Sequence, residues 1–204
     1  TEIEGQDVYL VELSDSHNLL ARGLDSLGLP LTAVDTINTS DADIASAFTS
    51  PDLTAAVAWN PQLTTMKDVD GANLVFSSAD IPGEILDLLV VDTATLEANP
   101  DLGKALVGIW YETVSLMLQD DEAGAEARAA MAQLAGATAE EYDGQLATTF
   151  LYPDAASAVA ATSSPEIIET MIRVRDFSFS QGLFGQGASS ADATGTTTTW
   201  TRSS

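Results

Sequence analysis

The sequence has little of several residue types on which catalysis and metal binding commonly depend. Its 204 residues include no cysteine and a single histidine. The absence of cysteine excludes disulfide frameworks, thiol catalysis and cysteine-ligated zinc, and one histidine excludes a histidine-cluster metal site. No glycine-rich phosphate loop occurs, and no uncharged apolar run reaches the roughly 18 residues that indicate a membrane span. We therefore predict neither a cofactor nor a bound metal.

Basic residues are also scarce, and acidic residues dominate. The chain has 31 Asp and Glu against 7 Lys and Arg, a formal net charge of -24. The excess is spread evenly, with 15 acids and 2 bases up to residue 90 and 16 acids and 5 bases after it. Nucleic acid is excluded as a partner, because phosphate binding needs clustered basic residues. The acids could bind metals or cationic partners, but their scatter without a calcium-loop pattern favours a surface adapted to salt, and so a halophilic or marine source.

The first ninety residues have the pattern of an α/β layer. Short runs rich in β-formers predict strands over 7–13, 33–37, 53–59, 73–77 and 86–91. Between them, helices are predicted over 18–27 and from residue 41, where Thr39 or Ser40 caps the start. This alternation predicts a parallel sheet. Ligand sites of such sheets lie beyond the carboxyl ends of the strands, here segments 14–17, 59–61 and 77–84.

The pattern from residue 99 onward is helical. Asn99 as cap and Pro100 at the first position begin a helix whose apolar residues, including Trp110, recur at helical spacing and predict a core face. Further helices are predicted over 122–134, from Thr138 with Glu141 completing a capping box, and over 166–174. Residues 187–204, rich in Gly, Ser and Thr, predict a disordered tail. No strands are predicted among these helices, so we expect them to cover a sheet that this chain does not contain.

Four segments together resemble the solute-binding proteins for nitrate, taurine and aliphatic sulfonates, and most of all the branch labelled as urea transporters. They are Val-Glu-Leu-Ser-Asp-Ser-His at 11–17, Asn-Thr-Ser-Asp-Ala-Asp at 38–43, Trp-Asn-Pro at 59–61 and Gly-Lys-Ala-Leu-Val-Gly-Ile-Trp-Tyr-Glu at 103–112. The similarity covers about residues 5–186. It implies a periplasmic-binding-protein-like clamshell, in which residues 5–90 form the second lobe and residues 91–186 return to coat a first lobe encoded upstream.

The resemblance also implies a function. A protein of this family is the periplasmic or extracellular component of an ABC importer, which captures a small solute and delivers it to a permease in the membrane. The apolar residues of the 100–118 helix, left bare without the first lobe, further predict pairing with a second copy as a homodimer.

The first group of candidate ligand contacts is Ser14, Asp15, Ser16 and His17, between a strand and a helix. Free N–H groups at a helix start favour polar ligand atoms, and the resemblance places Ser14, Ser16 and His17 against the ligand. Plain helix capping by Ser14 or Ser16 is the open alternative. The Asp15 carboxylate repels anions and only Arg22 lies near enough to offset it, so a urea-like amide or an amine is favoured over a sulfonate.

The second group lies at the ends of later strands. Trp59 offers an apolar or cation–π wall and Asn60 both a donor and an acceptor, although a core tryptophan before a turn is the alternative. By analogy with the family, Asp80 in the 77–84 loop would line the cleft or hinge, with a solvated surface acid as the open alternative, whereas Glu84 is better explained as a surface acid. Tyr111 and Glu112 could also reach the cleft.

An enzyme is the weaker interpretation. A Ser-His-Asp triad would have to use His17, whose neighbours Ser14, Ser16 and Asp15 are too close in sequence for triad geometry, so a distant serine would have to serve. Paired carboxylates could support a hydrolase or transferase, but among 31 acids any pair is uninformative. A non-catalytic acidic structural protein of the cell surface is the other alternative.

Overall fold

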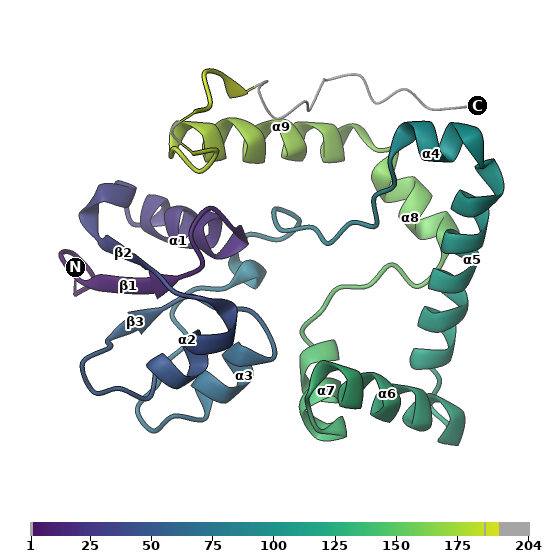
Figure 1. Ribbon diagram of the computed structural model, residues 1–204, viewed down its shortest axis with the longest axis horizontal. Helices are drawn as coiled ribbons and strands as arrows, with labels where there is room; N and C mark the ends of the chain where they lie inside the picture. The colour runs from purple at the N-terminus through teal and green to yellow at the C-terminus, as the bar shows by residue number, and fades with distance from the viewer. Residues whose placement is uncertain (1, 186, 192–204) are drawn as a thin grey trace. The chain divides into compact units, whose positions relative to one another are not determined.

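The chain divides into two compact units in the computed structural model, which describes residues 2–185 and 187–191 (Figure 1). The α/β unit comprises Thr1–Ile85 and Ile168–Ser204, and the helical unit comprises Leu86–Ile167. The helical unit is therefore inserted into the sequence of the α/β unit. Most of the predicted tail, residues 192–204, lies outside the described residues. The assignment of 5–90 and 91–186 to two lobes stays a prediction.

A sheet of three parallel strands lies at the centre of the α/β unit. The strands are β1 (Asp7–Leu10), β2 (Asp35–Asn38) and β3 (Ala55–Ala56), in the order β2-β1-β3. The register pairs Tyr9 with both Ile37 and Ala56. The middle strand is the most buried, since Leu10 has no exposed surface. The predicted parallel sheet is confirmed, although its strands are shorter than expected.

Two of the predicted strands do not form in the described part of the chain. Residues 73–77 and 86–91 have no strand structure, and Val90 is 79% exposed. Apolar, β-branched composition favours an extended backbone, but a strand also needs a neighbour that takes up its N–H and C=O groups. Neither segment pairs with the three strands of the sheet.

The helices of the α/β unit cover both faces of this sheet (Figure 1). They are α1 (Asp15–Ser26), α2 (Asp41–Ala47) and α3 (Gln62–Lys67), with short 3-10 turns η1 (Leu31–Ala33) and η2 (Ser78–Asp80) in the connections. Leu20 and Leu24 of α1 pack against Val8 and Leu10 of β1. The helix ends because Gly28 adopts a positive φ of 72°, which glycine tolerates at no steric cost.

A helix from the far end of the sequence completes the α/β unit. The helix is α9 (Pro165–Ser180), longer than the predicted 166–174, and from Ile168 onward it belongs to this unit. The Ser178 hydroxyl donates to Asn18 Oδ1 over 3.2 Å, and both side chains are buried. The guanidinium of Arg22 lies 5.2 Å from the centre of the Phe177 ring. These contacts fix α9 against α1.

The helical unit contains α4 (Thr93–Ala98), α5 (Pro100–Met117), α6 (Glu122–Ala135), α7 (Ala139–Leu146) and α8 (Ala155–Thr162). The capping box of Thr138 and Glu141 is confirmed, whereas Asn99 stands at the cap of α5 without a capping side-chain bond. The sequence analysis missed α4 and α8, although Asp92 and Asp154 cap them and gave a usable signal.

Contacts within the helical unit gather where α5, α6 and α7 meet. Arg128 donates to the carbonyl oxygens of Met117 and Gln119 at 2.8 and 3.0 Å and to Asp143 at 2.9 Å. A Cβ at residue 124 would collide with the Gln119 carbonyl, so only glycine fits there. Only Val114, Met117 and Ala132 are buried apolar residues among those described in this unit.

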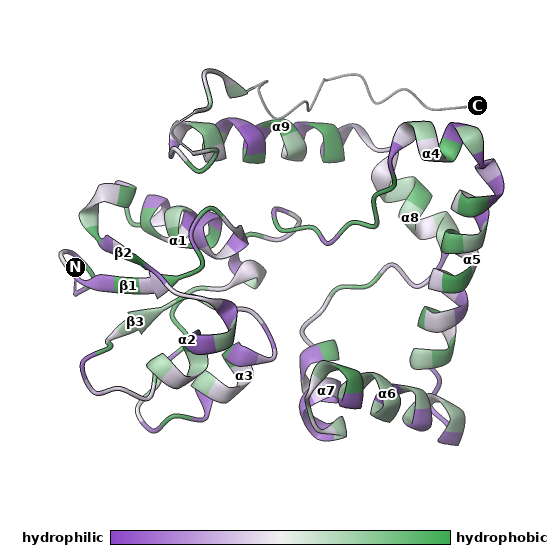
Figure 2. Cartoon of the chain, viewed as in Figure 1, coloured by the Kyte–Doolittle hydropathy of each residue, from purple (hydrophilic) through white to green (hydrophobic). Residues whose placement is uncertain are grey.

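The prediction that Trp110 is a core residue is wrong, since its side chain is 49% exposed. Figure 2 shows apolar stretches along α5 and along the segment before α4. The α6–α7 hairpin packs near the carboxyl end of α5, where Val114 and Met117 are buried, and leaves Trp110 and its neighbours uncovered. Helical spacing of apolar residues predicts a face of the helix, but not what covers that face.

Candidate functional site

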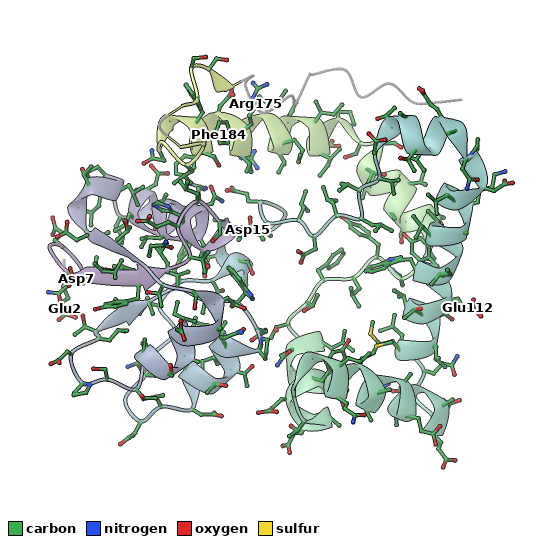
Figure 3. All side chains as sticks on the ribbon, in the orientation of Figure 1. Glu2, Asp7, Asp15, Glu112, Arg175 and Phe184 are labelled. Atoms are coloured by element: carbon green, nitrogen blue, oxygen red, sulfur yellow. The ribbon has the colours of Figure 1, made fainter. Side chains whose placement is uncertain are left out.

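The strand order creates a topological switch point at the carboxyl edge of the sheet. From β1 the chain passes to β2 on one side and then to β3 on the other side of β1. At such a switch point the connections leave the carboxyl ends of neighbouring strands in opposite directions, and open α/β sheets bind ligands there. Figure 3 shows Asp7 at the amino edge and Asp15 at this carboxyl edge. We refer to residues 11–17, after β1, and 57–62, after β3, as the carboxyl edge.

Ser14 is the N-cap of α1, which begins three residues earlier than predicted. Its side chain accepts from the Ser16 amide at 3.1 Å, and its hydroxyl donates to the Val11 carbonyl at 2.7 Å. The Ser16 side chain is buried. The capping alternative therefore holds for Ser14, and contact of either serine with a ligand stays a prediction.

His17 is the buried titratable group of the carboxyl edge. Its side chain is 7% exposed, and Nδ1 accepts from the Leu13 amide at 3.1 Å. Leu13 has a positive φ of 58°, uncommon for a leucine, which belongs to the turn that aims this amide at the ring. Burial lowers the pKa of His17 more than the nearby Glu12 carboxylate raises it, so the imidazole is neutral at neutral pH. With Nδ1 accepting, the proton resides on Nε2.

Asp15 is exposed in the first turn of α1. Arg22, the one nearby cation considered for offsetting its charge, is bonded elsewhere. The guanidinium donates to both Glu84 oxygens, at 2.7 and 3.1 Å, and to Asp25 at 2.8 Å. The hydrogen bond with Glu84 is the main cause that raises the pKa of Arg22. The positive charge of Arg22 is therefore engaged by Glu84 and Asp25.

The interpretation of Glu84 as a solvated surface acid is wrong. Its side chain is 10% exposed and pairs with Arg22, and Arg173 Nε of α9 lies 3.7 Å from its second oxygen. Arg22 stands 62 positions away in sequence, so nothing local signalled the pair. The 77–84 loop is thereby tied to α1 and α9.

The segment after β3 carries Trp59 and Asn60, as predicted, and one residue that the sequence analysis missed. Trp59 is 40% exposed, so the core alternative is wrong. Asn60 Oδ1 accepts from the Thr64 hydroxyl at 3.1 Å. Gln62, the first residue of α3, donates from Nε2 to Asp41 Oδ2 at 3.1 Å, while its Oε1 is buried. Its position directly after the Trp-Asn-Pro segment could have marked it as a candidate at this edge of the sheet.

The remaining candidates are not joined to the carboxyl edge by the described contacts. Asp80 lies in η2, not between two strands, and its carboxylate accepts from the Ser77 amide at 2.7 Å and hydroxyl at 3.2 Å as part of a capping box. Tyr111 is half-buried and Glu112 is exposed on α5 of the helical unit (Figure 3). Ligand contact by these three residues stays a prediction.

Among residues 2–185 and 187–191, no cluster of His, Asp or Glu could hold a metal ion. Within the same residues, no helix is both long and apolar enough to cross a membrane.

One solved structure gives the comparison. The chain is similar to the alkanesulfonate-binding protein SsuA from Xanthomonas axonopodis pv. citri bound to MOPS, with a TM-score of 0.64 and 19% sequence identity. The match covers 91% of this chain and 61% of SsuA, so the chain spans less than two thirds of that protein. No family model and no curated protein matches the sequence. At this identity the likeness establishes the fold, and the chain has the α/β, periplasmic-binding-protein-like fold that its sequence predicted.

Proposed function

We propose that this chain is the ligand-capturing part of an extracytoplasmic solute-binding protein that serves an ABC importer. The carboxyl edge at the switch point carries the argument, because it combines the start of α1, the buried His17 and the half-exposed Trp59. The fold is similar to that of SsuA, which binds alkanesulfonates. Both the carboxyl edge and the similarity to a binding protein support a site that binds a solute and performs no chemistry.

The contacts of His17 argue against a catalytic serine triad. A serine nucleophile needs a histidine nitrogen within hydrogen-bond reach of its hydroxyl. The Ser14 hydroxyl instead donates to a backbone carbonyl, and His17 Nδ1 is occupied by a backbone amide. No described serine pairs with the other ring nitrogen, Nε2. A capture role fits this geometry better than catalysis.

A neutral or cationic solute, such as a urea-like amide or an amine, fits the edge better than a sulfonate. The exposed Asp15 carboxylate lies in the first turn of α1, and Arg22 is bonded to Glu84 and Asp25. An anion would therefore meet a like charge at Asp15, while the Arg22 charge is already engaged by Glu84 and Asp25. A sulfonate is supported by the structural similarity to SsuA and by the sequence resemblance to the nitrate, taurine and sulfonate-binding proteins, but by no contact of this edge.

Binding would lead to transport through closure of the protein around the solute. Solute contacts from two lobes favour the closed state, and the closed form docks on a permease in the membrane. This places the chain in the periplasm or outside the cell. Pairing of two copies through the exposed apolar residues of α5 remains part of the proposal.

A thermal-shift titration in high salt tests the function. Urea, acetamide, ethylamine, taurine, MOPS and nitrate would each be added at millimolar concentration, and a solute that binds the folded form raises Tm with concentration. We expect shifts with the amides or the amine. The variant Trp59→Ala should lose the shift, whereas the matched change Trp110→Ala, in the helical unit, should keep it. Absence of a shift with every solute would contradict the binding function.

A further inference from the structure

Two buried polar atoms at the carboxyl edge have no hydrogen-bond partner among the described residues. They are Nε2 of His17 and Oε1 of Gln62. His17 follows β1 and Gln62 follows β3, and these strands are hydrogen-bonded neighbours that flank the switch point. No other described side chain has such an atom. Buried polar groups in native proteins are nearly always paired, so two at one sheet edge require an explanation.

The hydrogen-bonding sense of each atom follows from its neighbours. The Leu13 amide donates to Nδ1 of His17, so the ring proton is on Nε2 and this atom is a donor. The amide nitrogen of Gln62 donates to Asp41 Oδ2, so the other end of the group, Oε1, is an acceptor. The edge therefore offers one donor and one acceptor, each held by a bond on its far side.

A ligand group that matches this pair must accept one hydrogen bond and donate another. A carboxamide or a urea does so with its carbonyl oxygen and its N–H. A sulfonate group has acceptors only, and would leave Oε1 of Gln62 unpaired and facing another oxygen. Sites built to pair with a polar ligand group discriminate strongly against analogues that leave their own buried groups unpaired.

We propose that His17 and Gln62 together recognise a carboxamide or urea group, with Nε2–H of His17 donating to its oxygen and Oε1 of Gln62 accepting from its nitrogen. This inference rests on the proposed solute-binding function and adds Gln62 to the site. Both atoms are shielded from solvent, so the solute enters when a side chain moves.

The test is an NMR titration of the full chain that follows the indole N–H of Trp59 at the same edge. The probes are acetamide, N,N-dimethylacetamide, which lacks the N–H, and methanesulfonate. We expect acetamide to bind, and the other two to bind about tenfold more weakly or not at all, since each loses one hydrogen bond. The variants His17→Asn and Gln62→Met should each weaken acetamide binding by a similar factor.

The substitutions are chosen to keep the fold. Asparagine retains an oxygen near the position of Nδ1 to accept from the Leu13 amide but lacks a donor at Nε2. Gln6→Met is the matched control, because Gln6 precedes β1 at the amino edge of the sheet. It should bind acetamide like the unaltered chain. Melting temperatures of all variants separate loss of binding from loss of structure.

Each remaining outcome overturns a definite part of the argument. If the variants bind acetamide as well as the unaltered chain does, the inference fails and the solute-binding function stands. The same holds if methanesulfonate binds and acetamide does not. If no probe binds in this titration and no solute raises Tm in the thermal-shift experiment, both the inference and the solute-binding function are contradicted. Independently of any ligand, the 15N spectrum of the single histidine must show the proton on Nε2, and a proton on Nδ1 would overturn the inference.

Discussion

The two units of this chain use apolar residues in opposite ways. In the α/β unit, Val8, Leu10, Leu20 and Leu24 form a buried cluster between the middle strand and α1. In the helical unit many large apolar side chains are exposed, among them Leu89, Val90, Ile109, Trp110, Leu134 and Phe150. Non-local strand pairing closes the first unit around a core. Local capping and helix propensity suffice to form the helices of the second, but they do not bury its apolar faces.

The largest expected effect comes from the same substitution made in both units. Leu10→Ala removes a side chain with no exposed surface, so it should lower the free energy of unfolding by about 2–5 kcal/mol. Leu134→Ala, at a side chain that is 90% exposed, should change it by about 0.5 kcal/mol or less. Urea unfolding followed by circular dichroism measures both. Equal costs would mean that Leu134 is covered in solution and that the contrast between the units is false.

A second comparison concerns ion pairs. Glu84→Gln removes the carboxylate shared by Arg22 and Arg173 in a largely buried setting, and should cost about 1.5–3 kcal/mol. Asp101→Asn breaks the exposed pair with Lys104, and should cost less than about 1 kcal/mol. High salt should diminish the second effect more than the first. Indistinguishable urea midpoints for the two variants would show that the Glu84 pairs are not buried in solution.

A third comparison isolates local helix signals in the helical unit. Thr138 accepts from the Glu141 amide at 3.2 Å, so Thr138→Ala should destabilise this unit by about 1 kcal/mol. Asn99 occupies the cap of α5 without a side-chain bond, so Asn99→Ala should have a smaller effect. Helix content as a function of temperature reports both. A larger loss from Asn99→Ala would mean that its side chain does cap α5.

The smallest expected effect is a dependence on pH that belongs to the α/β unit. Burial lowers the folded-state pKa of His17 below its ordinary value of 6.5, so the unfolded chain binds the proton more readily. The stability contributed by neutral His17 is complete above pH 6.5 and is lost as the pH falls from there toward the folded-state pKa. The slope cannot exceed about 1.4 kcal/mol per pH unit.

Urea midpoints between pH 8 and pH 5 measure this dependence. Because the chain has one histidine, His17→Asn should flatten the curve in this range. An unchanged slope in the variant would assign the dependence to another group and contradict a buried, neutral His17.

What the sequence could predict was governed by short-range signals. The extended segments that became β1, β2 and β3, the helix from Pro100 and the capping box at Thr138 are each signalled by residues within a few positions of one another, and all of them formed. At the site, the alternative that Ser14 caps the helix depends on the same kind of local signal, and Ser14 is the N-cap of α1. These features need no knowledge of distant partners.

The wrong and missing predictions all depend on such distant partners. Residues 86–91 read as a strand but have no neighbour with which to pair, and Trp110 lies on an apolar face that nothing in its unit covers. Glu84 looked like a surface acid because Arg22 and Arg173 are far away in sequence. Gln62 was overlooked for a related reason, since its partner Asp41 lies at the start of a different helix.

The bond between Asn18 and Ser178 joins positions 160 residues apart, with the whole helical unit between them in sequence. A ribosome synthesises the strands and α1 before the helical unit, and α9 only after it. The side of α1 that α9 covers must therefore wait, during translation, until the entire insertion has emerged. Domains whose contacts are this distant in sequence fold slowly and expose apolar surface in the interval, so the newly made α/β unit is a natural client for chaperones.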